Sequence, residues 1–170
     1  WFILSGWIRL VKQSPQGRAV TLFVATAREP ISGVSALSFE RYGATAVAAT
    51  QVRVVQIPRA LIQDLIKKYP LFAEGIVAFC CKRIREMELA YAIAYDHVEQ
   101  RIAHVLSRLS DDFGTTLPFT HKEIAEMGGT ALETSIRVLS KMKRRGWLSV
   151  KRGQISLLKP AEFKKAVGLA

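Results

Sequence analysis

The chain has 170 residues, of which 49% are apolar and 23% charged, and its formal net charge is +11. This length and composition predict one or two globular domains with a core, and the excess of cations favours a polyanionic partner. No uncharged apolar run approaches the roughly 20 residues of a membrane-spanning helix, so no membrane partner is expected. The two cysteines, Cys80 and Cys81, are adjacent, which argues against a disulfide framework or a zinc site and favours a reducing cytoplasm.

Short strands separated by turn residues are expected in the first part of the chain. The apolar, alternating or β-branched runs cover residues 1–4, 7–12, 18–25 and 47–57. Strands so closely spaced predict a sandwich or barrel, and a short helix is expected over residues 59–68. The chain opens on an apolar run with neither an initiator methionine nor a basic region, so we expect a fragment rather than a signal peptide.

A long helix is expected from Pro70 to about Tyr95. Apolar side chains recur along it at alternating intervals of four and three, which is a heptad seam. The seam comprises Ala73, Val77, Cys80, Ile84, Met87, Tyr91 and Ala94. One interpretation is an amphipathic helix packed on its own domain, but we favour dimerisation. The dimer interface is then expected at Val77, Cys80, Ile84, Met87 and Tyr91.

Three capping-box patterns mark helix starts in the rest of the chain. They begin at Asp96, Thr120 and Thr130, and each ends in a glutamate three residues later. The first predicts a helix that runs to about Leu109, with a domain boundary near residue 95. The other two predict a helix-turn-helix whose second helix covers about 131–143.

The turn between these two helices and the segment after them complete the pattern. Ala125 and Gly129 are expected where the two crossing helices approach closely. Residues 147–150 and 154–158 predict a hairpin, and no acidic residue occurs between Ser135 and Gln154. A helix that can enter the major groove, flanked by cations for phosphates, is typical of a protein that reads DNA sequence.

Taken in order, these segments resemble the Crp/Fnr family of bacterial transcription regulators over essentially the whole chain. The segments that carry the resemblance are 2–6, 14–22, 33–37, 44–48, 96–101 and 120–137 with the wing. The resemblance implies an α+β fold. Its parts are a β-roll (double-stranded β-helix, cupin-like) sensor over 1–69, a dimerisation helix over 70–95 and a winged helix-turn-helix DNA-binding domain over 96–170. Family members have several tens of residues before the equivalent of Trp1, so the sensor is expected to be partial.

The resemblance assigns base contacts to Glu133 and Arg137 on the second helix of the motif. An arginine can donate two hydrogen bonds to guanine, and a glutamate can accept one from the cytosine amino group. The alternative is that Glu133 only closes its capping box and pairs with Arg137. Leu132 and Ile136 depart from the family pattern and are placed to touch thymine methyl groups, and Ser135 stands where the family has an apolar core residue.

Phosphate contacts are expected from threonines and cations near the helix starts and the wing. These candidates are Thr120, Lys122, Thr130, Thr134, Lys151 and Arg152. Each could equally be a solvated surface residue. The three histidines are expected on helix surfaces rather than as metal ligands, and the two cysteines as buried apolar residues rather than redox sensors.

The family's effector pocket corresponds to a loop and a strand of the sensor. The matching residues are Gly33, Val34, Ser35, Tyr42 and Ala44. Cyclic-nucleotide binders of the family have a glutamate after the loop glycine and an arginine–serine pair further on. Val34 and the pair Tyr42-Gly43 stand there instead, so cyclic AMP is not expected to bind. The cofactor stays unknown, and haem or an iron–sulfur cluster held by residues before Trp1 is left open.

The sequence therefore predicts a homodimeric, sequence-specific DNA-binding transcription regulator and not an enzyme. An effector or redox signal in the β-roll would control it. The partners implied are a pseudo-palindromic operator in double-stranded DNA, a second copy of the chain and RNA polymerase, all in the cytoplasm. The alternative is a ligand-binding or redox-sensing module whose winged helix contacts proteins.

Overall fold

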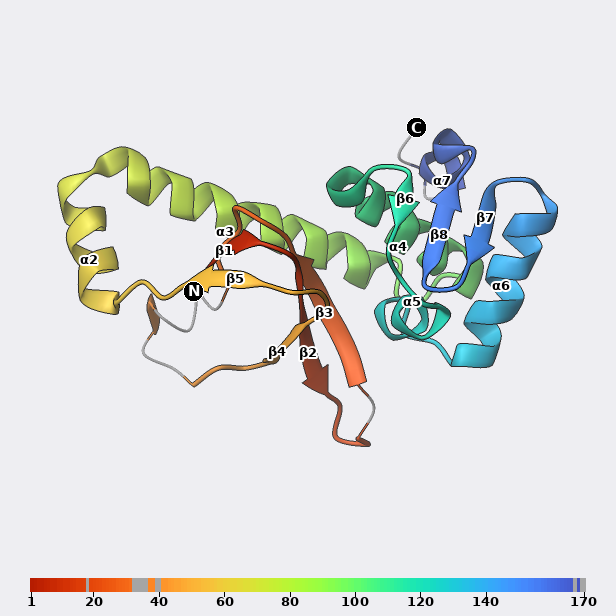
Figure 1. Ribbon diagram of the computed structural model, residues 1–170, viewed down its shortest axis with the longest axis horizontal. Coiled ribbons are helices and arrows are strands. Elements are labelled where there is room, and N and C mark those ends of the chain that lie inside the picture. Colours follow the sequence, from red (N-terminus) through yellow and green to blue (C-terminus); the bar gives the residue numbers. More distant parts are fainter. Residues whose placement is uncertain (18, 32–36, 39–40, 167, 169–170) are drawn as a thin grey trace. The chain divides into compact units, whose positions relative to one another are not determined.

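The computed structural model describes residues 1–170 apart from 18, 32–36, 39–40, 167 and 169–170. The chain divides into two compact units, Trp1–Tyr91 and Ala92–Ala170. The architecture is α+β, as expected: strands and a long helix in the first unit, a helix-turn-helix with a small sheet in the second (Figure 1). Among the described residues, no helix is both long and apolar enough to cross a membrane.

Two small antiparallel sheets form the β part of the first unit. The strands are β1 (Phe2–Ser5), β2 (Ile8–Gln13), β3 (Ala19–Ala25), β4 (Thr45–Ala48) and β5 (Arg53–Val55). One sheet pairs β1 with β5, and the other has the order β3-β2-β4. Ile8 lies opposite Ala25 on one neighbour and Ala48 on the other. The first three strands are found where the sequence predicted them, within one residue.

The prediction of a single strand over 47–57 is wrong. The chain bends there and passes from one sheet to the other. Gly6 makes the matching corner between β1 and β2 with a φ of +79°. A Cβ atom on Gly6 would collide with the carbonyl oxygen of Gln51, so only glycine fits this close approach. The Trp7 amide donates to Thr50 Oγ1 at 3.2 Å, and this hydrogen bond links the two corners.

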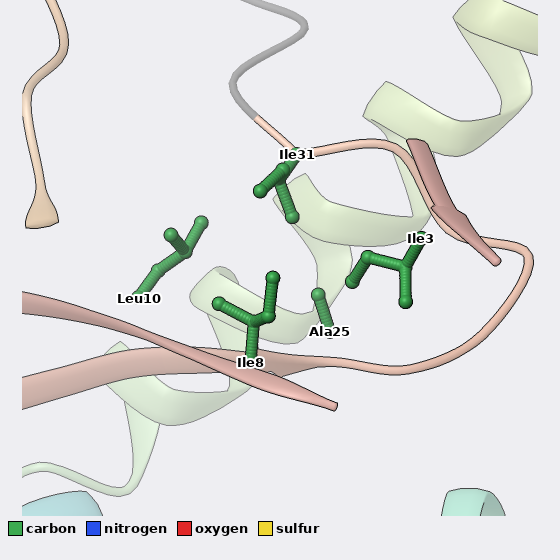
Figure 2. Packing of buried hydrophobic residues seen from close by; sticks show 5 residues of the cluster. All are labelled: Ile3, Ile8, Leu10, Ala25 and Ile31. Carbon is green, nitrogen blue, oxygen red and sulfur yellow. The ribbon is translucent and has the colours of Figure 1, made fainter. Parts of the chain in front are cut away.

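A buried apolar cluster lies inside these strands. Figure 2 shows Ile3, Ile8, Leu10, Ala25 and Ile31 directed toward one another from β1, β2, β3 and the turn that follows. All five are buried, and Phe23, Ala44 and Val52 pack on the margin of the cluster. The alternating pattern of the strands thus places one face of each on a common core.

Two helices complete the first unit. Helix α2 covers Arg59–Lys68, as the sequence predicted. Helix α3 covers Pro70–Ala92 and ends before the expected Tyr95. The Asp96 amide donates to the carbonyl oxygen of Ile93 in a turn that breaks the helix.

The second unit is built around the buried helix α4. Its elements are α4 (Val98–Phe113), β6 (Thr116–Leu117), α5 (His121–Met127), α6 (Leu132–Arg144), β7 (Leu148–Lys151), β8 (Gln154–Leu157) and α7 (Pro160–Ala166). The sheet has the order β6-β8-β7. Helix α4 runs past the expected Leu109 to Phe113, whose ring meets Phe119 edge-on with centroids 5.2 Å apart. Phe163 of α7, a helix that the sequence did not predict, is fully buried.

Only one of the three expected capping boxes forms. At α5, Thr120 Oγ1 accepts from the Glu123 amide, and Glu123 Oε2 accepts from the Thr120 amide at 2.8 Å. Helix α4 begins one residue later than expected, after His97, whose amide donates to the side chain of Gln100. The box at Thr130 is also wrong. The residue before α6 is Ala131, and no side chain caps the helix.

Candidate nucleic-acid interface

The turn between α5 and α6 depends on two glycines with different roles. The expected crowding occurs at Gly128, not at Gly129. A Cβ atom on Gly128 would lie 3.2 Å from the Ile124 carbonyl oxygen and 3.3 Å from Ile102 Cγ1, whereas a Cβ atom on Gly129 would meet no atom of the described chain within 4 Å. Gly129 instead has a φ of +59°, a left-handed conformation that residues with a side chain rarely adopt. Ala125 is buried, as expected, and its carbonyl oxygen accepts from the Thr130 amide at 3.0 Å.

One face of α6 is packed into the second unit. Val138, Leu139 and Met142 are buried, as the helical spacing predicted. Ser135 lies on the same face with no exposed surface, and its Oγ donates to the carbonyl oxygen of His121 at 3.1 Å. The buried hydroxyl is therefore satisfied, which explains how a polar residue occupies this position.

The opposite face of α6 presents both candidate base readers. Leu132, Glu133, Ile136 and Arg137 are all exposed, and their spacing of one, four and five places them on one side of the helix. Within the described part of the chain, Glu133 and Arg137 form no ion pair with each other. Glu133 therefore neither closes a capping box nor pairs with Arg137, and both charged groups face solvent.

A hollow of about 450 Å³ lies between the start of α5 and the wing. Its lining residues are Phe119, Thr120, His121, Val150, Lys151, Arg152 and Gly153. Three candidates for phosphate contact, Thr120, Lys151 and Arg152, thus meet at one place. Gly153 makes the tight wing turn with a φ of +69°. The hollow combines cations with the N-terminus of a helix, a combination that suits an anion.

The other three phosphate candidates lie outside this hollow. Lys122 is exposed on α5, and Thr130 and Thr134 are half-buried at the turn and on α6. The structure therefore brings together only half of the predicted set.

Two cations at the end of α6, which the sequence grouped with the candidate phosphate-contacting residues, form ion pairs with α4 instead. Lys141 Nζ and Arg145 Nη1 each lie 2.5 Å from a carboxylate oxygen of Glu99 on α4. The hydrogen bond from Lys141, together with the charges of Arg145 and Lys141, lowers the pKa of Glu99 against the opposing effect of burial. The guanidinium of Arg145 also lies over the Trp147 ring, 5.2 Å from its centroid. No local sequence pattern signals these pairs, because they join residues more than 40 positions apart.

Arg101 of α4 is a further residue that the sequence did not single out. Its Nε donates to the carbonyl oxygen of Gly128 at 3.0 Å, and one Nη donates to that of Gly129 at 3.3 Å. The other Nη donates to the carbonyl oxygens of Asp96 at 3.0 Å and Ala94 at 3.4 Å. The guanidinium thus contacts both the segment before α4 and the turn before α6.

In the first unit, α3 leaves most of its expected seam uncovered. Val77, Ile84, Met87 and Tyr91 are 54 to 73% exposed. Cys80 is half-buried and carries a free thiol. Ala94 lies beyond the end of α3 and does not extend the seam.

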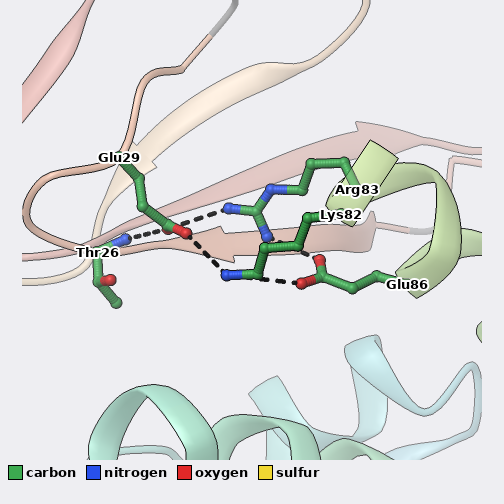
Figure 3. Close-up of polar contacts among 5 residues, drawn as sticks. All are labelled: Thr26, Glu29, Lys82, Arg83 and Glu86. Atoms are coloured by element: carbon green, nitrogen blue, oxygen red, sulfur yellow. Dashed lines mark hydrogen bonds and ion pairs between the residues drawn. The ribbon is translucent and has the colours of Figure 1, made fainter. Parts of the chain in front are cut away.

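A different face of α3 is fastened to the β strands by Arg83. Its two Nη atoms lie 3.0 Å from Glu29 Oε2 and 2.8 Å from Glu86 Oε2 (Figure 3). The guanidinium also lies over the rings of Phe23 and Phe79, 4.6 and 5.1 Å from their centroids. Because Glu29 follows β3, these contacts fix the helix against the turn after that strand.

The expected effector pocket is only partly within the described residues. Gly33, Val34 and Ser35 lie outside them. Tyr42 is exposed, and Ala44 packs on the margin of the β-strand core.

Among all the residues that the structure describes, no three His, Cys, Asp or Glu side chains are grouped so that they could hold a metal ion. The expectation of surface histidines is wrong for His104, which is buried in α4, and the two cysteines are half-buried rather than buried.

Known proteins share both parts of this arrangement. Residues 1–69 match the model of the cyclic nucleotide-binding domain, and residues 100–166 match that of the Crp-like helix-turn-helix domain. The Cyclic AMP receptor protein of Thermus thermophilus is 27% identical over 173 residues, which covers 100% of this chain and 80% of the relative. The Fumarate and nitrate reduction regulatory protein of Vibrio cholerae is 26% identical, over 99% of this chain and 70% of its own.

A solved structure agrees with these matches. The crystal structure of a CRP/FNR-family transcriptional regulator from Thermus thermophilus is 26% identical, with a TM-score of 0.74, and the alignment covers 98% of this chain and 86% of that one. The two matched domains follow one another in the order that the sequence predicted. The chain therefore belongs to the Crp/Fnr family of DNA-binding transcription regulators, which are not enzymes, and it joins an effector-sensing domain to a Crp-like helix-turn-helix domain.

Proposed function

We propose that the chain binds a pseudo-palindromic operator as a homodimer, with α6 of each copy in the major groove. The observation that carries this proposal is the exposed face of α6, where Glu133 and Arg137 stand one turn apart and form no ion pair with any described residue. In that position Arg137 reads a guanine, Glu133 a cytosine amino group, and Leu132 and Ile136 contact thymine methyl groups.

The phosphate contacts follow from the position of the wing. Lys151 and Arg152 flank the hollow at the start of α5, and Thr120 lies on its other side. A DNA phosphate seated there would meet two cations and the amides at a helix start. Lys122, Thr130 and Thr134 would contact neighbouring phosphates from α5, the turn and α6.

The partner of the exposed α3 seam is a second copy of the chain. Val77, Cys80, Ile84, Met87 and Tyr91 repeat at heptad spacing, and two parallel copies bring equivalent seam positions together. A two-fold dimer of this kind presents two copies of α6, which then read half-sites about 34 Å apart. The exposed apolar seam of α3 is why we infer a homodimer.

An effector would act by shifting the population between dimer arrangements that place the two α6 helices differently. RNA polymerase and a cytoplasmic location belong to the same proposal, since a bacterial transcription regulator acts on promoters. We infer that the effector is not cyclic AMP, although one relative is a Cyclic AMP receptor protein. The sequence has Val34, Tyr42 and Gly43 where nucleotide-binding members have acidic and phosphate-binding residues. Calorimetry at millimolar cyclic AMP should show no binding, and a micromolar affinity would contradict this inference.

Salt dependence of duplex binding tests the proposed function. A dimer that uses Lys122, Lys151 and Arg152 of both copies neutralises about six phosphates, so log K should fall with log salt with a slope near −5. Fluorescence anisotropy with a duplex selected from a random library would measure it. A slope near zero would contradict DNA binding and favour the alternative of a module whose winged helix contacts proteins.

A further inference from the structure

The guanidinium of Arg101 donates only to backbone carbonyl oxygens. Its acceptors are the carbonyl oxygens of Ala94, Asp96, Gly128 and Gly129, at 3.0 to 3.4 Å. Among the described residues, no carboxylate forms an ion pair with this half-buried cation. A planar group with five N–H donors can serve several acceptors in different directions at once, which a lysine ammonium on a flexible stem cannot do with the same geometry.

The four carbonyl groups belong to two segments that are distant in the sequence. Ala94 and Asp96 lie in residues 93–97, which connect α3 to α4. Gly128 is the C-terminal cap of α5, and Gly129 is the left-handed residue of the turn that leads into α6. One side chain thus fastens the connecting segment to the start of the helix that presents Glu133 and Arg137. The partial negative charge of carbonyl groups at the end of α5 favours a cation at this point.

The other end of α6 is fastened to the same turn of α4. Glu99 lies two residues before Arg101 and holds Lys141 and Arg145 in the last turn of α6. The first turn of α4 therefore contacts both the turn that leads into α6 and the C-terminal end of α6. A movement of residues 94–96 that broke the Arg101 contacts would release the turn at Gly128 and Gly129, while Ser135 and Glu99 still held α6 itself.

We propose that Arg101 is a positioning residue that couples the conformation of residues 94–96 to the turn that leads into the recognition helix α6. The coupling itself rests on contacts within the second unit, and its consequence for DNA rests on the function proposed above. Every signal that travels along the chain from the first unit must pass through residues 93–97, because they are the covalent connection. Arg101 gives such a signal a direct contact with the turn before α6.

Hydrogen exchange tests the coupling without DNA. The amides of Asp96 and Thr130 each donate to a carbonyl oxygen at 3.0 Å and report on the two fastened segments. In the full chain, Arg101→Lys should speed exchange at both amides about five- to tenfold, the effect of losing one or two hydrogen bonds. Buried amides in the middle of α4 should not change. The control is Arg144→Lys, an exposed arginine of α6, which should leave both amides unchanged.

A double-mutant cycle separates coupling from simple loosening. Asp96→Gly increases the freedom of the connecting segment and should speed exchange at Thr130 severalfold in the wild-type background. On the Arg101→Lys background, it should add nothing at Thr130. An unchanged Thr130 amide in Asp96→Gly, or the same increment in both backgrounds, would overturn the proposal. If Arg101→Lys does not fold, the exchange rate of the Thr130 amide in Asp96→Gly is the test, and an unchanged rate would overturn the proposal.

Duplex binding then distinguishes this inference from the function on which it rests. Arg101→Lys should weaken binding to the selected duplex severalfold without altering the salt slope, because no phosphate contact is lost. A slope lower by about two units, one for each copy of the dimer, would assign Arg101 to a phosphate and overturn the positioning role. Failure of the wild-type chain to bind any duplex would refute the proposed function, whereas the exchange cycle judges the coupling by itself.

Discussion

The two long helices of the chain differ in how their apolar side chains are covered. Helix α4 buries seven residues within its own unit, and none of the residues of α3 is buried. Both helices carry enough apolar residues to form a continuous face, so composition does not explain the contrast. The difference lies in what surrounds them: α5, α6 and α7 pack on α4, whereas the seam of α3 has no covering element in the described chain.

The polar contacts of the two helices, made by Arg83 on α3 and by Arg101 on α4, also differ. Arg83 of α3 contacts Glu29 and Phe23, which fix one face of the helix to the β part of the unit, and it also contacts Glu86 and Phe79 of its own helix. Arg101 of α4 contacts four carbonyl groups in two loops. Helix α3 is therefore held on one face and open on another, whereas α4 is the centre around which the DNA-binding unit is organised.

The largest expected effect comes from removing core side chains of α4. Leu106 has no exposed surface, and Leu106→Ala should lower the free energy of unfolding by about 2–5 kcal/mol, because a buried cavity is left behind. Met87→Ala on α3 is the matched change at an exposed position and should cost less than about 1 kcal/mol where the protein is monomeric. Urea denaturation followed by circular dichroism measures both. Equal losses would mean that α3 has a core of its own.

The second prediction concerns the open face of α3. Ile84→Glu places a charge on the seam and should weaken self-association at least about 100-fold, or about 2.7 kcal/mol, so that sedimentation at micromolar concentration shows monomers. Leu61→Glu introduces the same charge at an exposed apolar position of α2 and should leave the dimer intact. A dimer that survives Ile84→Glu would place the interface elsewhere.

A smaller effect is expected from the ion pairs between α4 and α6. The folded state lowers the pKa of Glu99 below its ordinary value of 4.5, chiefly through the hydrogen bond from Lys141. The stabilisation is therefore present above that value and is lost as the pH falls through the lower, folded-state pKa. Because its partners are partly exposed, it should amount to at most about 1 kcal/mol.

Acid titration of stability measures this contribution. Wild type should lose more stability than Glu99→Gln between pH 6 and pH 3, and the two should converge at the acid end. Glu133→Gln is the control, since it removes an exposed carboxylate that forms no ion pair within the described part of the chain. Parallel profiles for wild type and Glu99→Gln would show that the pairs contribute nothing to folding.

The sequence predicted features that depend on local periodicity. The inward face of α6 followed from the spacing of Val138, Leu139 and Met142, and the start of α5 from the box that begins at Thr120. The same box pattern was wrong at Asp96 and Thr130. A capping box requires backbone geometry that neighbouring elements can override, and at Asp96 the glutamate is engaged by α6 instead.

Features that depend on distant contacts could not be predicted. The corner between β4 and β5 exists because Gly6 allows the close approach of Gln51, which no window around residues 47–57 reveals. The contacts of Arg101 escaped prediction because backbone carbonyl groups have no sequence signature. Helix α7 is shorter than two turns, too short for a periodic pattern to emerge.

The exposed face of α6 was predictable, but which of its basic residues form ion pairs within the unit was not. Exposure at Glu133 and Arg137 follows from helical periodicity and charge. The assignment of Lys141 and Arg145 to Glu99 needed the packing of α6 on α4. The sequence thus predicted which face of α6 is exposed better than which cations remain free of ion pairs within the unit.

The central claim is that the exposed face of α6 reads DNA sequence while the wing contacts only the backbone. Competition titrations of Arg137→Ala and Lys151→Ala, each with a selected site and a scrambled duplex, test it most directly. Arg137→Ala should cost about 1–3 kcal/mol on the selected site and relax discrimination at one base pair in each half-site. Lys151→Ala should weaken both duplexes alike and lower the salt slope by about two units, one for each copy of the dimer. Equal weakening of both duplexes by Arg137→Ala would contradict the claim.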